Sequence, residues 1–249
     1  MPDPATVLVP AVLLAAAFVH GVFGFGFPML ATPLLALGMP LPAAIQLTLL
    51  PTIATNLGSI AGERHRGEAL RRFWPIPLCT GVGSFTGTQV LLAVDPGPVR
   101  LLLAGLLVGY LLAERLHAAE HQVVVPLWGL GLLGLVLGLL AGVANIFGPV
   151  IIIFALYTRM PTTLMVAAFN LSFVTSKTGQ LLGFAWNGAL DTGLLVQTLW
   201  LLPGVLLALW LGISLRRRIQ PAHYRRLLRA GLWLLAAALV WDVLRADGG

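Results

Sequence analysis

Eight long apolar stretches run through this chain, and they restrict its fold more than any other feature. The stretches cover residues 5–37, 43–62, 73–94, 98–116, 123–157, 162–185, 190–215 and 224–244. A helix that crosses a bilayer needs about 20 predominantly apolar residues. Only 10% of the residues are charged, whereas a soluble domain carries about 25%, so the chain cannot cover a water-facing surface. The sequence therefore predicts an all-α polytopic membrane protein.

The first and fifth stretches are too long for one simple membrane span. Each is interrupted by a segment rich in glycine and proline, at residues 21–28 and 142–149. Both residue types break helices. We expect each interrupted stretch to form a broken re-entrant helical hairpin, with helix N-termini near the midplane whose positive partial charge suits an anion. The alternative is a glycine face for tight helix packing.

The two halves of the chain align without gaps at an offset of 121 residues. The informative matches are glycines and prolines: Gly21 with Gly142, Pro28 with Pro149, Pro40 with Pro161, and Gly58 with Gly179. We predict an internal duplication, with residues 1–122 as the first transmembrane repeat and residues 123–249 as the second. Paired Gly/Pro-interrupted segments in two halves point to the binding site of a transporter.

The arginines predict how the two repeats are oriented. They gather after the second and the seventh apolar stretch, in loops that hold Arg64, Arg66, Arg71 and Arg72, and Arg216, Arg217, Arg218, Arg225, Arg226 and Arg229. If every stretch crossed once, the two clusters would lie on opposite sides of the membrane, against the positive-inside rule. If the interrupted stretches are hairpins, both clusters are cytoplasmic and both termini are outside. Each repeat then has a hairpin followed by three membrane-spanning helices, and the repeats are inverted.

Lys177 is the only charged residue deep within an apolar stretch. A lysine at the bilayer centre costs about 2.5–3.5 kcal/mol on insertion scales. It either snorkels to an interface or is neutral in a packed site, or it provides the counter-charge for a substrate anion. Asn56 is the residue of the first repeat that aligns with Lys177. Asn170 and Gln180 could lie on the same helix face as Lys177. The predicted substrate-binding residues are Gly24, Phe25, Gly26, Thr52, Asn56, Asn145, Gly148, Asn170, Lys177 and Gln180.

The remaining polar residues argue against other classes of protein. The nine acidic residues lie in loops or near helix ends, which argues against a carboxylate proton relay or a hydrolytic pair. The only cysteine is Cys79, so no cysteine-based metal site exists. His117 and His121 have a spacing that could bind a metal, but a solvated charged linker is favoured. His20, beside the first interruption, is either a polar site residue or a helix-end hydrogen-bonding group. We therefore expect no enzyme, cofactor or metal.

One pattern of motifs resembles a known family of membrane proteins. It comprises the glycine-rich segment ending in Pro28, residues 34–40, a helix dotted with polar residues up to Asn56, and the basic loop 64–67, and the whole arrangement repeats. Over nearly the full chain it resembles the sulfite exporter TauE/SafE family. This chain departs from the usual run of consecutive glycines, because phenylalanines interleave the first copy and Asn145-Ile-Phe147 replaces it in the second.

The resemblance implies movement of sulfite, organosulfonates and related small anions across the cytoplasmic (inner) membrane, commonly outward. The expected partners are a small anionic substrate and the lipid bilayer, with a homo-oligomer left open. The net charge of +6 fits positive-inside loops rather than nucleic-acid binding. The alternatives to an exporter are an anion channel and a non-transport membrane subunit of a larger complex.

Overall fold

The described part of the protein is helical throughout. The structure is a computed structural model that describes residues 4–63, 66–94, 125–145, 150, 154, 158 and 162–216. Its helices are α1 (Pro4–Phe23), α2 (Phe27–Ala36), α3 (Leu41–Ala61), α4 (Arg66–Phe73), α5 (Pro75–Ala93), α7 (Leu127–Ala144), α9 (Thr162–Trp186) and α10 (Thr192–Arg216). The all-α prediction is confirmed for these residues, while the predicted repeat boundary at 122 and 123 lies outside them.

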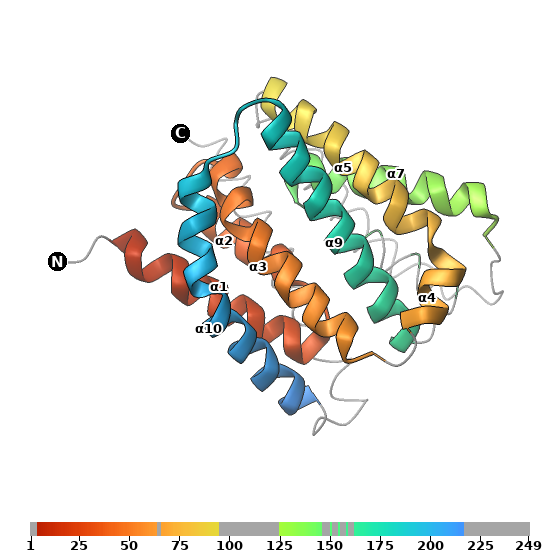
Figure 1. The fold of residues 1–249 in the computed structure, drawn as a ribbon, viewed down its shortest axis with the longest axis horizontal. Helices are drawn as coiled ribbons and strands as arrows, with labels where there is room; N and C mark the ends of the chain where they lie inside the picture. The colour runs from red at the N-terminus through yellow and green to blue at the C-terminus, as the bar shows by residue number, and fades with distance from the viewer. Residues whose placement is uncertain are drawn as a thin grey trace, which may run out of the picture.

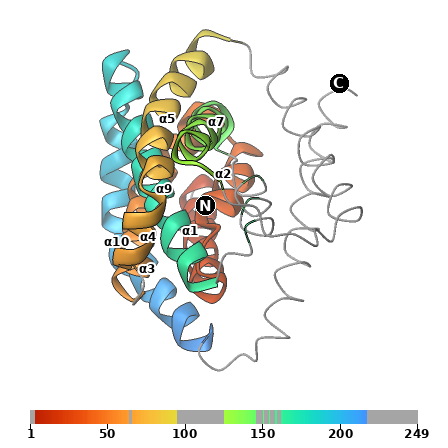
Figure 2. The same cartoon turned by 90° about the vertical axis from the view of Figure 1, so that its right-hand side faces the viewer.

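The described helices form two layers, and α3 and α9 lie in the middle of one of them (Figure 1). α3 and α9 run side by side in the middle, with α10 on the α3 side and α5 on the α9 side. Figure 2 shows α1, α2 and α7 in a second layer behind these four helices. α1 and α2 pack against α3, and α7 packs against α5. The two central helices therefore have neighbours on their flanks and behind them, and they carry most of the predicted polar site.

Helix α4 corrects one expectation. The basic segment after the second apolar stretch was predicted as a loop, but residues Arg66–Phe73 form a helix. Ala69 and Phe73 lie four residues apart and are both buried, so they share one face. α4 packs against α9, and Arg71 and Arg72 remain exposed. The apolar pair, which is easily overlooked among the arginines, gives this segment a face to bury.

The first predicted interruption is a break between two helices. α1 ends at Phe23 and α2 begins at Phe27. Gly24 (φ +82°) and Gly26 (φ +103°) both adopt positive φ, which glycine adopts without a steric penalty. In the second half, α7 ends at Ala144 and Asn145 takes a left-handed conformation (φ 61°). Residues 146–149 lie outside the described residues, so the re-entrant path of either segment stays a prediction.

Other glycines allow helices to cross closely. A Cβ atom on Gly21 would lie 2.3 Å from the carbonyl oxygen of Leu209, and Gly212 meets α1 in the same way. On the opposite flank, a Cβ atom on Gly142 would lie 2.4 Å from the carbonyl oxygen of Ser84. Small residues let helix backbones approach. The glycine-packing interpretation therefore describes Gly21 and Gly142, whereas Gly24 and Gly26 shape the break that follows α1.

The outer surface is apolar, as a bilayer requires. Among the described residues, α3, α5 and α10 are long and apolar enough to cross a membrane. Shorter apolar helices cover Val7–Phe23, Phe27–Ala36 and Leu127–Val143. Large apolar side chains such as Trp186, Trp200 and Trp210 are exposed on this surface. Exposed apolar area of this extent marks a membrane or protein contact rather than a water-facing surface.

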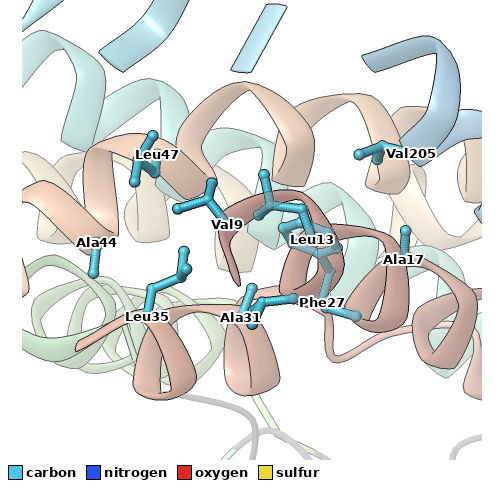
Figure 3. Close-up of a cluster of buried hydrophobic side chains, with 11 residues drawn as sticks. Val9, Leu13, Ala17, Phe27, Ala31, Leu35, Ala44, Leu47 and Val205 are labelled. Carbon is cyan, nitrogen blue, oxygen red and sulfur yellow. The ribbon is translucent and has the colours of Figure 1, made fainter. Parts of the chain in front are cut away.

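An apolar cluster fixes the helices on both sides of the first break (Figure 3). Its labelled members come from α1, α2, α3 and α10: Val9, Leu13, Ala17, Phe27, Ala31, Leu35, Ala44, Leu47 and Val205. Phe27, the first residue of α2, is fully buried in it. Because the first turn of α2 is anchored by packing, the glycine break beside it is held in one place.

Candidate functional site

Lys177 lies near the middle of α9 and is fully buried. Its Nζ donates hydrogen bonds to Oδ1 of Asn145 and to Oε1 of Gln180, the latter at 2.5 Å. Both acceptors are neutral amide oxygens. Among the described residues no carboxylate pairs with Lys177. The side chain is thus turned into the protein rather than extended to an interface, and its ammonium group has neutral acceptors.

Asn145 connects Lys177 to the first half of the chain. It follows the last turn of α7, where its backbone N–H bonds to the carbonyl of Ala141 at 2.7 Å. Asparagine is one of the few residues that tolerate the left-handed conformation found here. Its Nδ2 donates to Oγ1 of Thr32 in α2, and the Thr32 and Thr48 hydroxyls lie 3.1 Å apart. A continuous polar chain therefore runs from α9 through the end of α7 to α2 and α3.

Gln180 holds the other side of the lysine. Its Oε1 accepts from Lys177, and its Nε2 donates to the carbonyl oxygen of Ala141 at 2.7 Å. Both polar atoms of the amide are used. Since Asn145 and Gln180 both bond to Ala141 and to Lys177, the ammonium group is fixed against the last turn of α7.

Asn170 ties α9 to the first break. Its Nδ2 donates to the carbonyl oxygens of Gly24 and Val166, both at 2.7 Å. One residue away, the rings of Phe25 and Phe169 pack edge to face with centroids 5.6 Å apart. The segment 24–26 is therefore held against α9 by a hydrogen bond and a ring contact, two helical turns before Lys177.

His20 completes the break as a helix-end group. Its Nδ1 accepts from the backbone N–H of Phe27 at 3.2 Å, and its Nε2 lies 3.0 Å from Oγ of Ser59. Because a backbone N–H can only donate, Nδ1 is an acceptor and Nε2 carries the proton. Of the two interpretations of His20, the helix-end role matches this geometry. It also occupies one of the α2 N-terminal N–H groups that were expected to face an anion.

Three buried polar atoms among the described residues have no protein partner: Thr52 Oγ1, Asn56 Oδ1 and Asn170 Oδ1. The Nδ2 atoms of Asn56 and Asn170 both bond to backbone carbonyls, for Asn56 the carbonyl of Thr52 at 2.7 Å. The nitrogen must face a carbonyl, so the orientation of each amide is fixed and its oxygen is left free. Buried polar groups normally have a partner. The two amide oxygens only accept hydrogen bonds, whereas the oxygens of an anion need donors; the Thr52 hydroxyl can donate as well as accept.

The structure brings most of the predicted site residues together by hydrogen bonds or direct contacts. Asn145, Lys177 and Gln180 form one cluster, and Gly24, Phe25 and Asn170 form a second. Thr52 and Asn56 are linked to one another on the buried face of α3. Gly26 is the cap residue of α2, and no atom of the described residues lies within 4 Å of the point to which a Cβ atom would project. Gly148 lies outside the described residues.

The prediction missed Thr32, which links the lysine cluster to Thr48, a polar residue that the sequence had marked on the helix of Asn56. It also missed Ser84 of α5, whose hydroxyl lies 3.0 Å from that of Ser176, which the sequence had placed on the helix face of Asn170 and Gln180. Their hydroxyls are buried. Isolated serines and threonines also occur inside apolar helices as helix–helix contacts. The helix neighbours, which the sequence does not give, were needed to find Thr32 and Ser84.

A helical protein with an apolar outer surface and a buried lysine on one of its central helices has the construction of a membrane transporter. The family model described as Sulfite exporter TauE/SafE matches residues 8–239. The match covers most of the chain, and the protein belongs to this family of transporters for sulfite-type anions. Neither a curated protein nor a solved structure gives a significant match.

Proposed function

We propose that this protein exports a small oxyanion, such as sulfite or an organosulfonate, across the cytoplasmic membrane, and that Lys177 binds the anion. The observation that carries the proposal is the complete burial of Lys177 beside neutral amide acceptors. An ammonium group has three donors, and two of them have partners here. A buried charge is costly unless it is paired. An anion at the third donor would neutralise it.

In this mechanism Asn145 and Gln180 orient the ammonium group. Both amides are fixed at the end of α7. The ammonium group is therefore held in one position before a ligand binds. The backbone of Gly24–Gly26 lines the approach to the site in this proposal, and Gly148, which lies outside the described residues, stays a predicted site residue. Irregular backbone within a membrane is tolerated where it lines a cavity or is buried in protein. Movement of either break would then open the site to one side.

The free oxygens of Asn56 and Asn170, with the Thr52 hydroxyl, have a different role. The two amide oxygens can only accept, so they do not bind the oxygens of an anion directly, whereas the Thr52 hydroxyl can both accept and donate. We assign them to water molecules that accompany the anion, because each of these atoms is buried without a protein partner. A bridging water can donate to both an amide oxygen and an anion. Thr52, Asn56 and Asn170 thus bind the substrate through its hydration.

We also propose that the two repeats are inverted. The support is an equivalence between helix crossings: Gly21 of α1 meets α10, and its repeat mate Gly142 of α7 meets α5. α10 and α5 occupy corresponding places in the two halves. Each half would thus contribute one helix to the flank of the other. This exchange suits alternating access, in which one repeat rocks against the other around a fixed site.

The test is binding and flux of sulfite in purified protein. Lys177 is the only lysine of the sequence, so isotope-labelled lysine gives a single side-chain NMR signal. Sulfite should shift this signal and raise the melting temperature of the wild type. Lys177→Ala should fold and yet show no sulfite-dependent stabilisation and no saturable flux in proteoliposomes. Gln89→Ala removes a polar side chain outside the cluster and is the control.

Equal stabilisation of wild type and Lys177→Ala would remove Lys177 from the site. Flux that rises linearly with sulfite and never saturates would favour the channel alternative. No flux in the wild type, together with a stable co-purified partner, would favour a non-transport subunit.

A further inference from the structure

Arg216, the last residue of α10, is positioned beside the first helix break. Gly212 of α10 packs directly against the backbone of α1 at Gly21. The two glycines are so close that a Cβ atom on either one would overlap the Cα atom of the other. Arg216 lies one turn after Gly212, and Gly24 lies about one turn after Gly21. The guanidinium group therefore reaches Gly24: a Cβ atom there would lie 2.5 Å from Nη1. The crossing thus aims the arginine at the break.

The other side of the guanidinium group binds a carboxylate. Nη2 of Arg216 donates to Oε1 of Glu63 at 2.9 Å. Glu63 directly follows the last turn of α3, where its N–H bonds to the carbonyl of Ile60 at 3.0 Å. The Glu63 side chain is 11% exposed and that of Arg216 29%. The pair therefore joins the ends of α3 and α10 across the break and is mostly withdrawn from solvent.

A simple surface ion pair would not require this arrangement. Exposed pairs contribute little to stability, and a cation in the last turn of a helix is favourable by itself. Neither reason explains why Nη1 points to a glycine. Gly24 is also the residue whose carbonyl accepts from Asn170, two turns before Lys177 on α9. Seven residues of helix span about 10 Å, so Gly24 lies between Arg216 and the lysine site.

Resting on the proposed function, we propose that Arg216 is a second anion-binding residue, which receives the oxyanion before it reaches Lys177. The carboxylate of Glu63 occupies this position in the empty protein. A planar guanidinium fork binds carboxylates and tetrahedral or pyramidal oxyanions through the same donors. The arriving anion displaces Glu63, and Glu63 returns when the anion moves on. The missing side chain of Gly24 leaves room for the guanidinium group beside the break, because a Cβ atom there would lie 2.5 Å from Nη1.

If the anion displaces Glu63 from Arg216, replacing these two residues should have opposite effects on the half-saturating sulfite concentration. Arg216→Gln removes the receiving charge, and it should raise the half-saturating sulfite concentration for flux by about tenfold, the loss of one charge-assisted hydrogen bond. Glu63→Gln removes the competitor, and it should lower the half-saturating concentration severalfold. Arg71→Gln removes an exposed charge from α4; it controls for a general loss of positive surface and should match the wild type.

The decisive variant is the charge swap Glu63→Arg with Arg216→Glu. It keeps an ion pair between α3 and α10 but places a carboxylate against Gly24. We expect thermal stability within a few degrees of the wild type, sulfite-dependent stabilisation that persists, and sulfite flux in proteoliposomes reduced at least tenfold. Should the swap fail to fold, the opposite shifts of the two single variants provide the test. Wild-type flux in the swap, or equal half-saturation in both single variants, would overturn the inference alone. Absence of sulfite flux in the wild type would instead overturn the proposed function, and this inference with it.

Discussion

The ammonium group of Lys177 donates to the side chain of Asn145, the residue that ends α7 in a left-handed conformation. Two features that are 32 residues apart in the sequence are thereby joined: the buried lysine and the end of α7. The Asn145 amide holds the ammonium group against this end of the helix. In the proposed mechanism, a movement of this helix end would change the partners of the ammonium group and would couple conformation to anion binding.

Replacing Asn145 with aspartate should supply a permanent anion to Lys177. The carboxylate would pair with the ammonium group and mimic the bound substrate, so sulfite affinity should fall about tenfold or more. Melting temperature without ligand should stay the same or rise, because a buried charge gains a partner. Isothermal titration with sulfite and a melting curve measure both quantities. Asn187→Asp, which introduces the same charge at a more exposed amide, should leave sulfite binding intact.

Lys177→Arg should keep binding but change which anion is preferred. The guanidinium group retains the positive charge while presenting a planar fork instead of a compact ammonium. The ranking of sulfite, sulfate and an alkanesulfonate as competitors of labelled sulfite flux should therefore change. An identical ranking in both proteins would mean that the lysine provides charge without shape recognition.

Gly26→Leu should block flux and leave insertion into the membrane intact. Gly26 has φ +103°, where a side chain costs roughly 1–3 kcal/mol, and among the described residues nothing lies within 4 Å of its Cβ position. A leucine would fill the approach to the break. Flux in proteoliposomes is measured against Gly67→Leu in α4, where a side chain also meets nothing within 4 Å. Full transport by Gly26→Leu would leave only a packing role for this glycine.

Much of the fold was predictable because helix signals are local. The apolar stretch 162–185 corresponds to α9 at Thr162–Trp186, and 190–215 corresponds to α10 at Thr192–Arg216. The glycines at 24 and 26 marked the break because a positive φ is most easily adopted by glycine. Lys177 was identified because a charge inside an apolar helix is conspicuous on its own.

The rest of the site depends on tertiary contacts. Arg216 was interpreted only as a topological signal in a loop, because its partner Glu63 is 153 residues away. Likewise, the sequence indicated that Asn56 and Asn170 are polar, but not that their nitrogens are bound to backbone carbonyls. Which end of an amide is free depends on where its neighbours lie, and this decides whether it can bind an anion directly.

The inverted-repeat proposal predicts the location of both arginine clusters. Reporter proteins fused after Arg72 and after Arg218 should both report the cytoplasmic side, and a fusion at the C-terminus should report the outer side. The reason is the excess of arginine in cytoplasmic loops. Opposite signals from the first two fusions would contradict inverted repeats and would place the hairpin proposal in conflict with the chain's charge distribution.

The membrane potential should drive export. The buried ionisable side chains in the described spans are His20 and Lys177, with no aspartate or glutamate among them, so a carboxylate proton relay has no evident members there. His20 is engaged on both ring nitrogens at the first break.

An inside-negative potential favours the exit of an anion by about 2.3 kcal/mol per charge per 100 mV. Sulfite efflux from proteoliposomes should therefore increase when a potassium gradient with valinomycin makes the interior negative, and it should decrease when the gradient is reversed. The same vesicles with a proton gradient and a clamped potential are the control. Efflux that followed the proton gradient and ignored the potential would contradict electrogenic uniport and would direct attention to His20 as a proton carrier.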